Sequence, residues 1–173
     1  MAGYQGHDRS DVGTNYEELT GQLHYQSGDR FGIVASEFNR VIVDPLLAGA
    51  RAGFHTVGAQ DSALTVVWVP GALEIVGAIR QLLVSRSLAG VIAVGAVVRG
   101  ETSHYDVVVN QSAGQLMTLA ASADVPIVNA ILTVENIEQG LNRAGGKDGN
   151  KGFDGALSLV RLVDLYRRLA KES

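Results

Sequence analysis

Short apolar runs alternate with longer segments of helical periodicity from residue 31 to the end of the chain. The apolar runs are continuous rather than alternating, which is typical of strands in a parallel sheet that helices cover on both faces. These runs predict strands over Phe31–Ala35, Leu64–Val69, Gly90–Val98 and Pro126–Leu132. Apolar residues spaced three and four apart predict helices over Val41–Val57, Ala72–Arg86, His104–Ser122, Glu135–Asn142 and Lys151–Leu169.

The strand–helix order, repeated four times and followed by a last helix, predicts an α/β fold. Right-handed crossovers then give a three-layer sandwich with a flavodoxin-like, four-stranded parallel sheet. We expect residues 21–173 to form this one domain, because no repeat or linker interrupts them. Residues 1–20 are polar and are predicted to be a mobile N-terminal tail. Residues 21–25 are a candidate for an extra N-terminal edge strand.

The amino-acid composition and net charge exclude several classes of protein. The 173 residues contain no Cys, which excludes a disulfide scaffold, a thiolate metal site and a cysteine nucleophile. A net charge of −4 argues against nucleic acid as a partner. No apolar run reaches the ~18 residues of a membrane span, and the polar, acidic start is unlike a signal peptide, so we expect a cytoplasmic protein. The 18% of charged residues is low, which indicates surface buried against other chains.

Polar and glycine-rich segments follow each predicted strand. Because ligands bind beyond the carboxyl ends of parallel strands, these segments are expected to meet at one rim of the sheet. They are Ser36–Asn39, Pro70–Glu74, Val97–His104 and Thr133–Asn136.

The segment after the third strand has the most residues that could bind an anion or transfer a proton. Thr102 or Ser103 is a plausible N-cap for the next helix, whose free N–H groups and dipole would attract an anion. His104 begins that helix and could exchange protons near neutral pH. The alternative is a capping turn with a surface histidine.

The segments after the first two strands each have a residue that could contact a ligand, and each residue also has a purely structural interpretation. Phe38 could stack on a planar heterocycle while Asn39 bonds its edge, or Phe38 could be an apolar plug beneath the loop. Glu74 could bond a polyol, or it could simply be a favourable charge near a helix N-terminus.

Residues 143–152 form a glycine-rich stretch with three cations, which could hold a phosphate or be a flexible turn between helices. The spacing of a P-loop and that of a dinucleotide-binding glycine fingerprint are both absent. His7, His24 and His55 lack metal-ligand spacing, so no metal is expected.

Several motifs, taken in order, resemble the lumazine synthase family, whose full name is 6,7-dimethyl-8-ribityllumazine synthase. The resemblance runs from about Gly21 to Leu169. The matching pieces are Phe38-Asn39, residues 69–75 (VPGALEI), 95–106 (GAVVRGETSHYD), 132–139 (LTVENIEQ), 143–145 (RAG) and 149–152 (GNKG).

This resemblance implies an enzyme that condenses 5-amino-6-(D-ribitylamino)uracil with 3,4-dihydroxy-2-butanone 4-phosphate. The products are 6,7-dimethyl-8-ribityllumazine, phosphate and water, in the penultimate step of riboflavin biosynthesis. The family uses no cofactor and no metal.

The resemblance also implies a role for each matching residue. Phe38 would stack on the pyrimidine, Arg143 of a neighbouring subunit would reach the phosphate, and His104 would shuttle protons. The remaining contacts would be Asn39, Ala72, Leu73 and Glu74 along the ribityl chain, Ala96, Val97 and Val98 at the ring edge, and Glu101 and Thr102 at the phosphate.

One departure bears on affinity. The family often has an aromatic residue, stacked on the second face of the substrate ring, where this chain has Asn129. We expect Asn129 to weaken pyrimidine binding and to leave the reaction intact, because its amide can still hydrogen-bond the ring.

The resemblance further implies a homopentamer, and in many members twelve pentamers close into a sixty-subunit icosahedral shell, with riboflavin synthase as a possible partner. Residues 21–25 could then extend a neighbour's sheet. Two alternatives stay open: a non-catalytic riboflavin- or lumazine-binding shell protein on the same fold, and an unrelated, monomeric flavodoxin-like phosphate-binding or signalling domain.

Overall fold

The computed structural model describes residues 16–171, and most of the predicted tail lies outside them. Four parallel strands form the central sheet in the order β2-β1-β3-β4. Their bounds are β1 Phe31–Ser36, β2 Leu64–Val69, β3 Gly90–Val98 and β4 Ile127–Val134. The helices are α1 Arg40–Thr56, α2 Ile75–Ser85, α3 His104–Ser122, α4 Ile137–Arg143 and α5 Lys151–Lys171, with short 3₁₀ turns η1 Asp61–Ala63 and η2 Ala72–Glu74.

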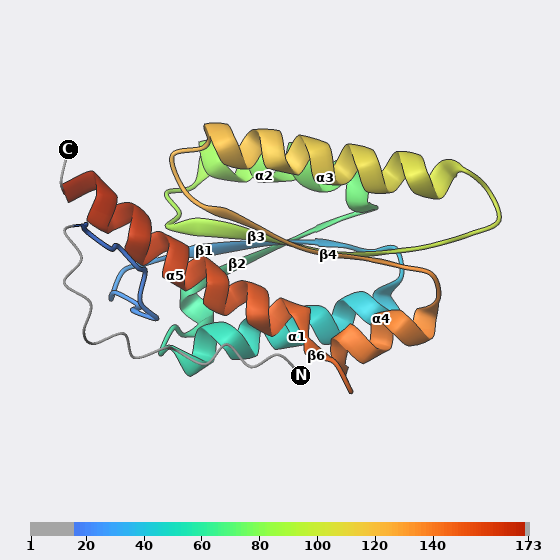
Figure 1. The fold of residues 1–173 in the computed structure, drawn as a ribbon, viewed down its shortest axis with the longest axis horizontal. Helices are drawn as coiled ribbons and strands as arrows, with labels where there is room; N and C mark the ends of the chain where they lie inside the picture. The colour runs from blue at the N-terminus through green and yellow to red at the C-terminus, as the bar shows by residue number, and fades with distance from the viewer. Residues whose placement is uncertain (1–15, 172–173) are drawn as a thin grey trace.

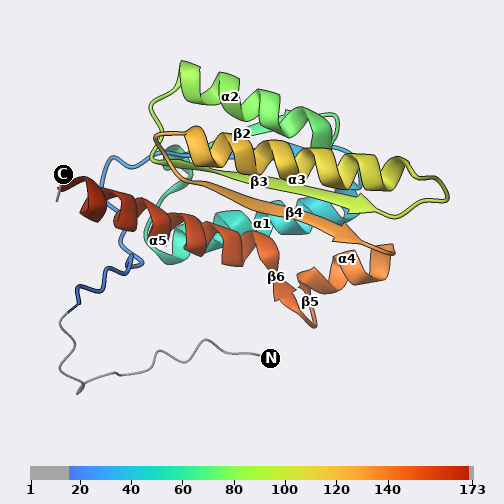
Figure 2. The same ribbon diagram turned by 45° about the horizontal axis from the view of Figure 1, so that its top comes forward.

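Helices cover both faces of the sheet, so the predicted three-layer sandwich is confirmed. Helices α2 and α3 lie on one face, and α1, α4 and α5 lie on the other (Figures 1 and 2). Among residues 16–171, no helix is both long enough and apolar enough to cross a membrane.

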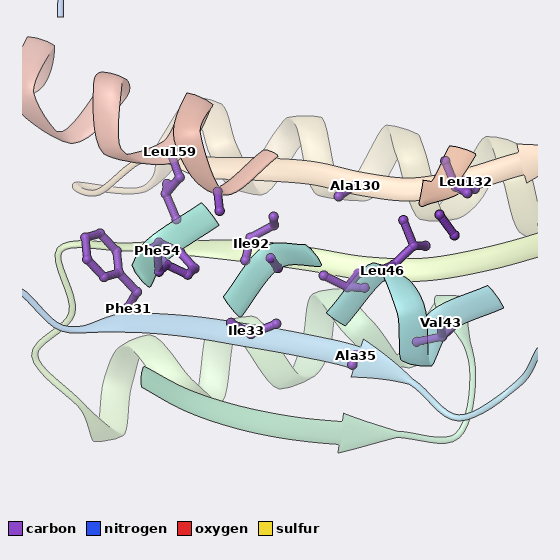
Figure 3. Close-up of a cluster of buried hydrophobic side chains, with 14 of the residues drawn as sticks. Phe31, Ile33, Ala35, Val43, Leu46, Phe54, Ile92, Ala130, Leu132 and Leu159 are labelled. Carbon is purple, nitrogen blue, oxygen red and sulfur yellow. The ribbon is translucent and has the colours of Figure 1, made fainter. Parts of the chain in front are cut away.

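Alternate residues of the strands build two cores, one on each face of the sheet. Phe31, Ile33 and Ala35 of β1 face α1 and α5, whereas Val34 faces α2. On the α1/α5 side the ring of Phe31 stacks on Phe54 with centroids 4.6 Å apart (Figure 3). The continuous apolar runs of the sequence therefore reflect burial on both faces.

Strand β1 lies between β2 and β3 and pairs with both in parallel. Phe31 is in register with Leu64 on one side and with Gly90 on the other. The chain thus leaves β1 in one direction to form β2 and comes back to place β3 on the opposite side. This reversal opens a crevice between the carboxyl ends of β1 and β3, where ligands bind in open α/β sheets.

The observed ends of several elements differ from the prediction for local reasons. Strand β4 continues to Val134 because its ladder with β3 continues to Val98. Helix α4 begins at Ile137, two residues late, because the side chain of Asn136 caps it by accepting the N–H of Gln139 at 2.9 Å. The region predicted as one helix from Ala72 begins with the turn η2.

The glycine-rich stretch after α4 is a hairpin rather than an unstructured turn. Strands β5 (Ala144–Gly146) and β6 (Gly149–Asn150) pair antiparallel, and Gly145 and Gly149 take positive φ angles. The side chain of Asn150 then joins two helices. Its Oδ1 accepts the N–H groups of Gly152 and Phe153 at the start of α5, and its Nδ2 donates to the carbonyl of Pro45 in α1 at 2.9 Å.

Residues 21–25 do not pair with the sheet of their own chain. The Gln22 N–H donates instead to the carboxylate of Asp164 on α5 at 2.8 Å, and Gly21 lies directly against the carbonyl of Arg161. The Gln22 N–H lowers the pKa of Asp164 below its ordinary value, and the nearby Arg168 guanidinium acts in the same direction. Within the chain, Gly21 and Gln22 therefore pack on α5.

Gly152→Ala should lower the free energy of unfolding by at least about 2 kcal/mol, because overpacking a tight contact forces the backbone to move. A Cβ at this position would lie 2.0 Å from the carbonyl oxygen of Leu46, where α5 crosses α1. Urea unfolding measures the change.

Gly77→Ala is the matched control, because a Cβ at this exposed position of α2 meets nothing within 4 Å. It should raise stability by about 0.5–1 kcal/mol through helix propensity. Equal losses in the two variants would contradict close α1–α5 packing.

Candidate active site

A cavity of about 390 Å³ lies at the carboxyl ends of β1, β2 and β3. Three of the four rim segments predicted from the sequence reach it. Its wall consists of Phe38 and Asn39 after β1, Gly71–Glu74 after β2, Ala96–Val98 at the end of β3, and Gly100, Thr102, His104, Tyr105 and Val108 beyond it.

The turn after β1 presents Phe38 to solvent. The Phe38 N–H donates to the carbonyl of Pro70 at 3.1 Å, which holds the β1 and β2 ends together. The side chain is 73% exposed, so it is not the apolar plug of the plain alternative. An exposed aromatic ring at the mouth of a cavity can stack on a planar ligand.

Asn39 joins the two strands that flank the crevice. Its Nδ2 donates to the carbonyl of Ala96 at 2.9 Å. It is also the only non-glycine residue of 16–171 with a positive φ, 62°. Because asparagine tolerates this left-handed conformation better than most residues, the sequence can start α1 while the amide stays over the cavity. The amide oxygen is left as the acceptor for a ligand.

Gly71 makes room for an acidic side chain. The turn η2 brings Glu74 back over Gly71, so that a Cβ on Gly71 would lie 3.0 Å from the carboxylate. Glu74 is exposed and lines the cavity. Its two carboxylate oxygens can accept hydrogen bonds from hydroxyl groups of a ligand.

The start of α3 points at the cavity from the third side. Ser103 occupies the N-cap position, as predicted, but its side chain makes no capping hydrogen bond. The first N–H groups of a helix have no partner within the helix, so here they can serve an anion. His104 is exposed beside them and lines the same cavity.

Three residues proposed from the resemblance do not line this cavity. Glu101 lies in the loop between Gly100 and Thr102, and its side chain is exposed. Asn129 lies on the outer strand β4, beside Lys151, Asp154 and Ser158 of α5. Arg143 ends α4, where it donates to the carbonyl of Gln139 and lies 3.8 Å from Asp148.

Two wall residues, Tyr105 and Val108, lie outside the predicted rim segments, whereas Gly71 and Gly100 lie within them but were given no role. Helical spacing could have found Val108, because it lies one turn after His104 and therefore on the same face of α3. Tyr105 gave no such signal. No group of three or more His, Asp or Glu side chains within 16–171 is arranged to hold a metal ion.

Comparison with known proteins gives one family. The sequence model of 6,7-dimethyl-8-ribityllumazine synthase matches residues 28–167. The chain is 39% identical to the 6,7-dimethyl-8-ribityllumazine synthase of Leuconostoc mesenteroides subsp. mesenteroides over 144 residues, which cover 83% of this chain and 92% of the relative. It is 40% identical to the enzyme of the same name from Clostridium kluyveri over 142 residues, covering 82% and 92%.

Replacing Asn39 separates its backbone role from its hydrogen bond. Asn39→Gly keeps the positive φ and loses only the bond to Ala96, whereas Asn39→Ala loses both. We expect the alanine variant to be less stable than the glycine variant by about 1–2 kcal/mol, the cost of a left-handed residue with a Cβ. Urea unfolding of both variants checks this, and equal stabilities would contradict it.

Proposed function

Because the chain belongs to the 6,7-dimethyl-8-ribityllumazine synthase family, we propose that it condenses 5-amino-6-(D-ribitylamino)uracil with 3,4-dihydroxy-2-butanone 4-phosphate. It is then a transferase of riboflavin biosynthesis that releases 6,7-dimethyl-8-ribityllumazine, phosphate and water. The observation that carries the proposal is the cavity itself. In a member of this family, an aromatic ring, a carboxylate and a histidine lie on one wall beside a helix N-terminus.

The cavity has the chemistry that each half of the reaction needs. Phe38 offers a face for the pyrimidine, while Asn39, Ala72, Leu73 and Glu74 follow as a strip for the ribityl chain. The ring edge meets Ala96, Val97 and Val98, whose backbone groups can read its polar atoms. The phosphate is assigned to the start of α3, with the N–H groups of Glu101 and Thr102 as donors.

The reaction requires mainly that the two reactants be held in the correct relative orientation. The 5-amino group attacks the ketone carbon and expels water, and loss of a proton then breaks the C–O bond to phosphate. The hydroxyl-bearing carbon becomes a carbonyl by proton shift, and the ribityl-bearing nitrogen attacks it, closes the ring and expels a second water. Holding both reactants in one cavity can contribute ~7–11 kcal/mol. His104 takes and returns protons at the amine and the departing oxygen, which adds about 10²–10⁴-fold. The anion site both binds the phosphate and stabilises it as it leaves.

Arg143 and Asn129 lie away from their own chain's cavity, which supports assignment of both to the cavity of a neighbouring protomer. The Asn129 Oδ1 accepts the N–H of Ile131 at 2.9 Å, so its amide NH₂ group is free to donate to the ring. A homopentamer, alone or in an icosahedral shell, completes five sites in this way.

Helix α3 independently supports burial of its outer side by other copies of the chain. No charged residue occurs between Asp106 and Asp124, yet only Ser112 and Leu116 of the helix are buried. Val107 is 52% exposed and Met117 is 73% exposed. An uncharged helix face of this length is typical of an interface between subunits. The proposed location is the cytoplasm, with riboflavin synthase, which uses the product, as a proposed partner.

Mixing the two substrates with the protein tests the function. Growth of lumazine absorbance and fluorescence in proportion to protein concentration supports the enzyme. No product at high protein concentration, together with tight binding of riboflavin, would favour the non-catalytic shell protein. Mass measurement of the intact particle separates a pentamer from a shell, and a mass of one chain would contradict the assembly.

His104→Ala should slow turnover by about 10–10³-fold without abolishing it, because alignment of the reactants survives. Steady-state kinetics on the intact assembly measures the loss. Complete loss of activity with the assembly intact would mean that His104 does more than transfer protons.

Arg143→Ala should raise the KM of the phosphate substrate far more than that of the pyrimidine. Equal effects on the two KM values would contradict the phosphate assignment. Co-assembly with His104→Ala then tests the shared site, because an Arg143→Ala protomer that supplies the cavity regains an intact site when its neighbour, a His104→Ala protomer, supplies Arg143. Activity of the mixture above the average of the two separate assemblies supports a shared site, and activity equal to that average is the result for a site built within one chain.

A further inference from the structure

Arg99 lies between two residues of the cavity wall but is not part of that wall. Val98 and Gly100 line the cavity, and Arg99 does not. Its backbone N–H donates to the carbonyl of Val134 at 2.9 Å and so extends the β3–β4 pairing by one bond past the end of β3. Its side chain is therefore directed at the outside of the loop that carries the start of α3.

The guanidinium of Arg99 contacts three residues, one just after β4 and two in the first turn of α3. Its Nε donates to the carboxylate of Glu135 at 2.7 Å, just after β4. Its Nη1 lies 3.5 Å from the carboxylate of Asp106, in the first turn of α3. Its Cζ lies 4.0 Å from the ring centroid of Tyr105, which is itself a cavity residue. The hydrogen bond that Arg99 donates to Glu135 raises the pKa of Arg99 above its ordinary value.

These contacts fix both ends of the segment from Gly100 to Ser103. One end is held by the backbone bond to Val134, and the other by Tyr105 and Asp106. Glu135 is in turn held by its own N–H, which donates to Oε1 of Gln139 in α4 at 3.0 Å. The segment contains two residues of the cavity wall, Gly100 and Thr102.

We propose that Arg99 is a positioning residue, which acts through Tyr105 and the Gly100–Ser103 segment to hold the anion-binding start of α3 in place. The proposal rests on the proposed function for the identity of the anion, a phosphate monoester. Arg99 does not touch the substrate. A planar guanidinium serves a carboxylate at its edge and an aromatic ring at its face together, which the single ammonium group of lysine does not.

The matched experiment compares Arg99→Met and Arg99→Lys with Arg51→Met in the full-length assembly. Arg51 is also an exposed arginine in an ion pair, with Asp61 at 2.9 Å, and it lies in α1 away from the cavity wall. Binding of inorganic phosphate is measured by ³¹P NMR titration, and the two KM values are measured separately. The phosphate titration reports on the anion site whether or not the chain turns over substrate.

Arg99→Met should weaken phosphate binding about tenfold and raise the KM of the phosphate substrate by a similar factor, with less than about a twofold change for the pyrimidine. Arg99→Lys should recover part of the loss, and Arg51→Met should show none. Glu135→Gln, which removes one charge and keeps the shape, is expected to give a smaller loss in the same direction, and it serves as the second variant where Arg99→Met lowers stability.

Unchanged phosphate binding in Arg99→Met would overturn the positioning role, as would equal losses for both substrates or an equal loss in Arg51→Met. A wild-type chain that binds phosphate but makes no lumazine overturns the proposed function alone, and the titration then still decides the role of Arg99. A wild-type chain that makes lumazine but binds no inorganic phosphate overturns the positioning role alone, and one that does neither overturns both.

Discussion

The parallel pairing of β1 with β3 is the constraint on which the rest of the structure depends. The chain winds outward from this pair in both directions, to β2 and to β4, so only here do the connections separate and leave a crevice. The bond from Asn39 to the carbonyl of Ala96 spans that crevice, and every wall segment is placed relative to it. If β3 paired with β1 one residue out of register, the side chains of β3 would change to the opposite face of the sheet, and Phe38 and His104 would no longer line one cavity.

Elements with strong local signals could be predicted from the sequence, and those set by distant contacts could not. Strand β2 and helix α3 match the prediction at both ends, because a proline follows one and a polar loop precedes the other. Residues 21–25 form no strand within the chain, where the Gln22 N–H donates to the carboxylate of Asp164, which lies 142 positions away in the sequence. No residue close to Gln22 in the sequence indicates that contact. The pairing of residues 21–25 with a neighbour's sheet stays a prediction.

The same division applies to the cavity. Phe38, Glu74 and His104 were found because each lies in the segment that follows a strand, and parallel strands end at one edge of the sheet. Tyr105 was missed because its place in the wall depends on Arg99 and Glu135, which come together only when β3, β4 and α3 are packed. Asn129 and Arg143 lie outside the cavity of one chain, so their assignment needs the family and an assembly rather than this fold alone.

The side chain of Asn150 makes the conformation of the hairpin between α4 and α5 depend on the packing of two helices. Its one amide group closes the start of α5 and binds the carbonyl of Pro45, so the hairpin is fixed only after α1 and α5 have docked. Arg143 precedes this hairpin directly and takes its orientation from it. The orientation of Arg143 therefore depends on the tertiary structure of its own chain, and in the proposed shared site this orientation has to be set before the side chain can reach a neighbour's cavity.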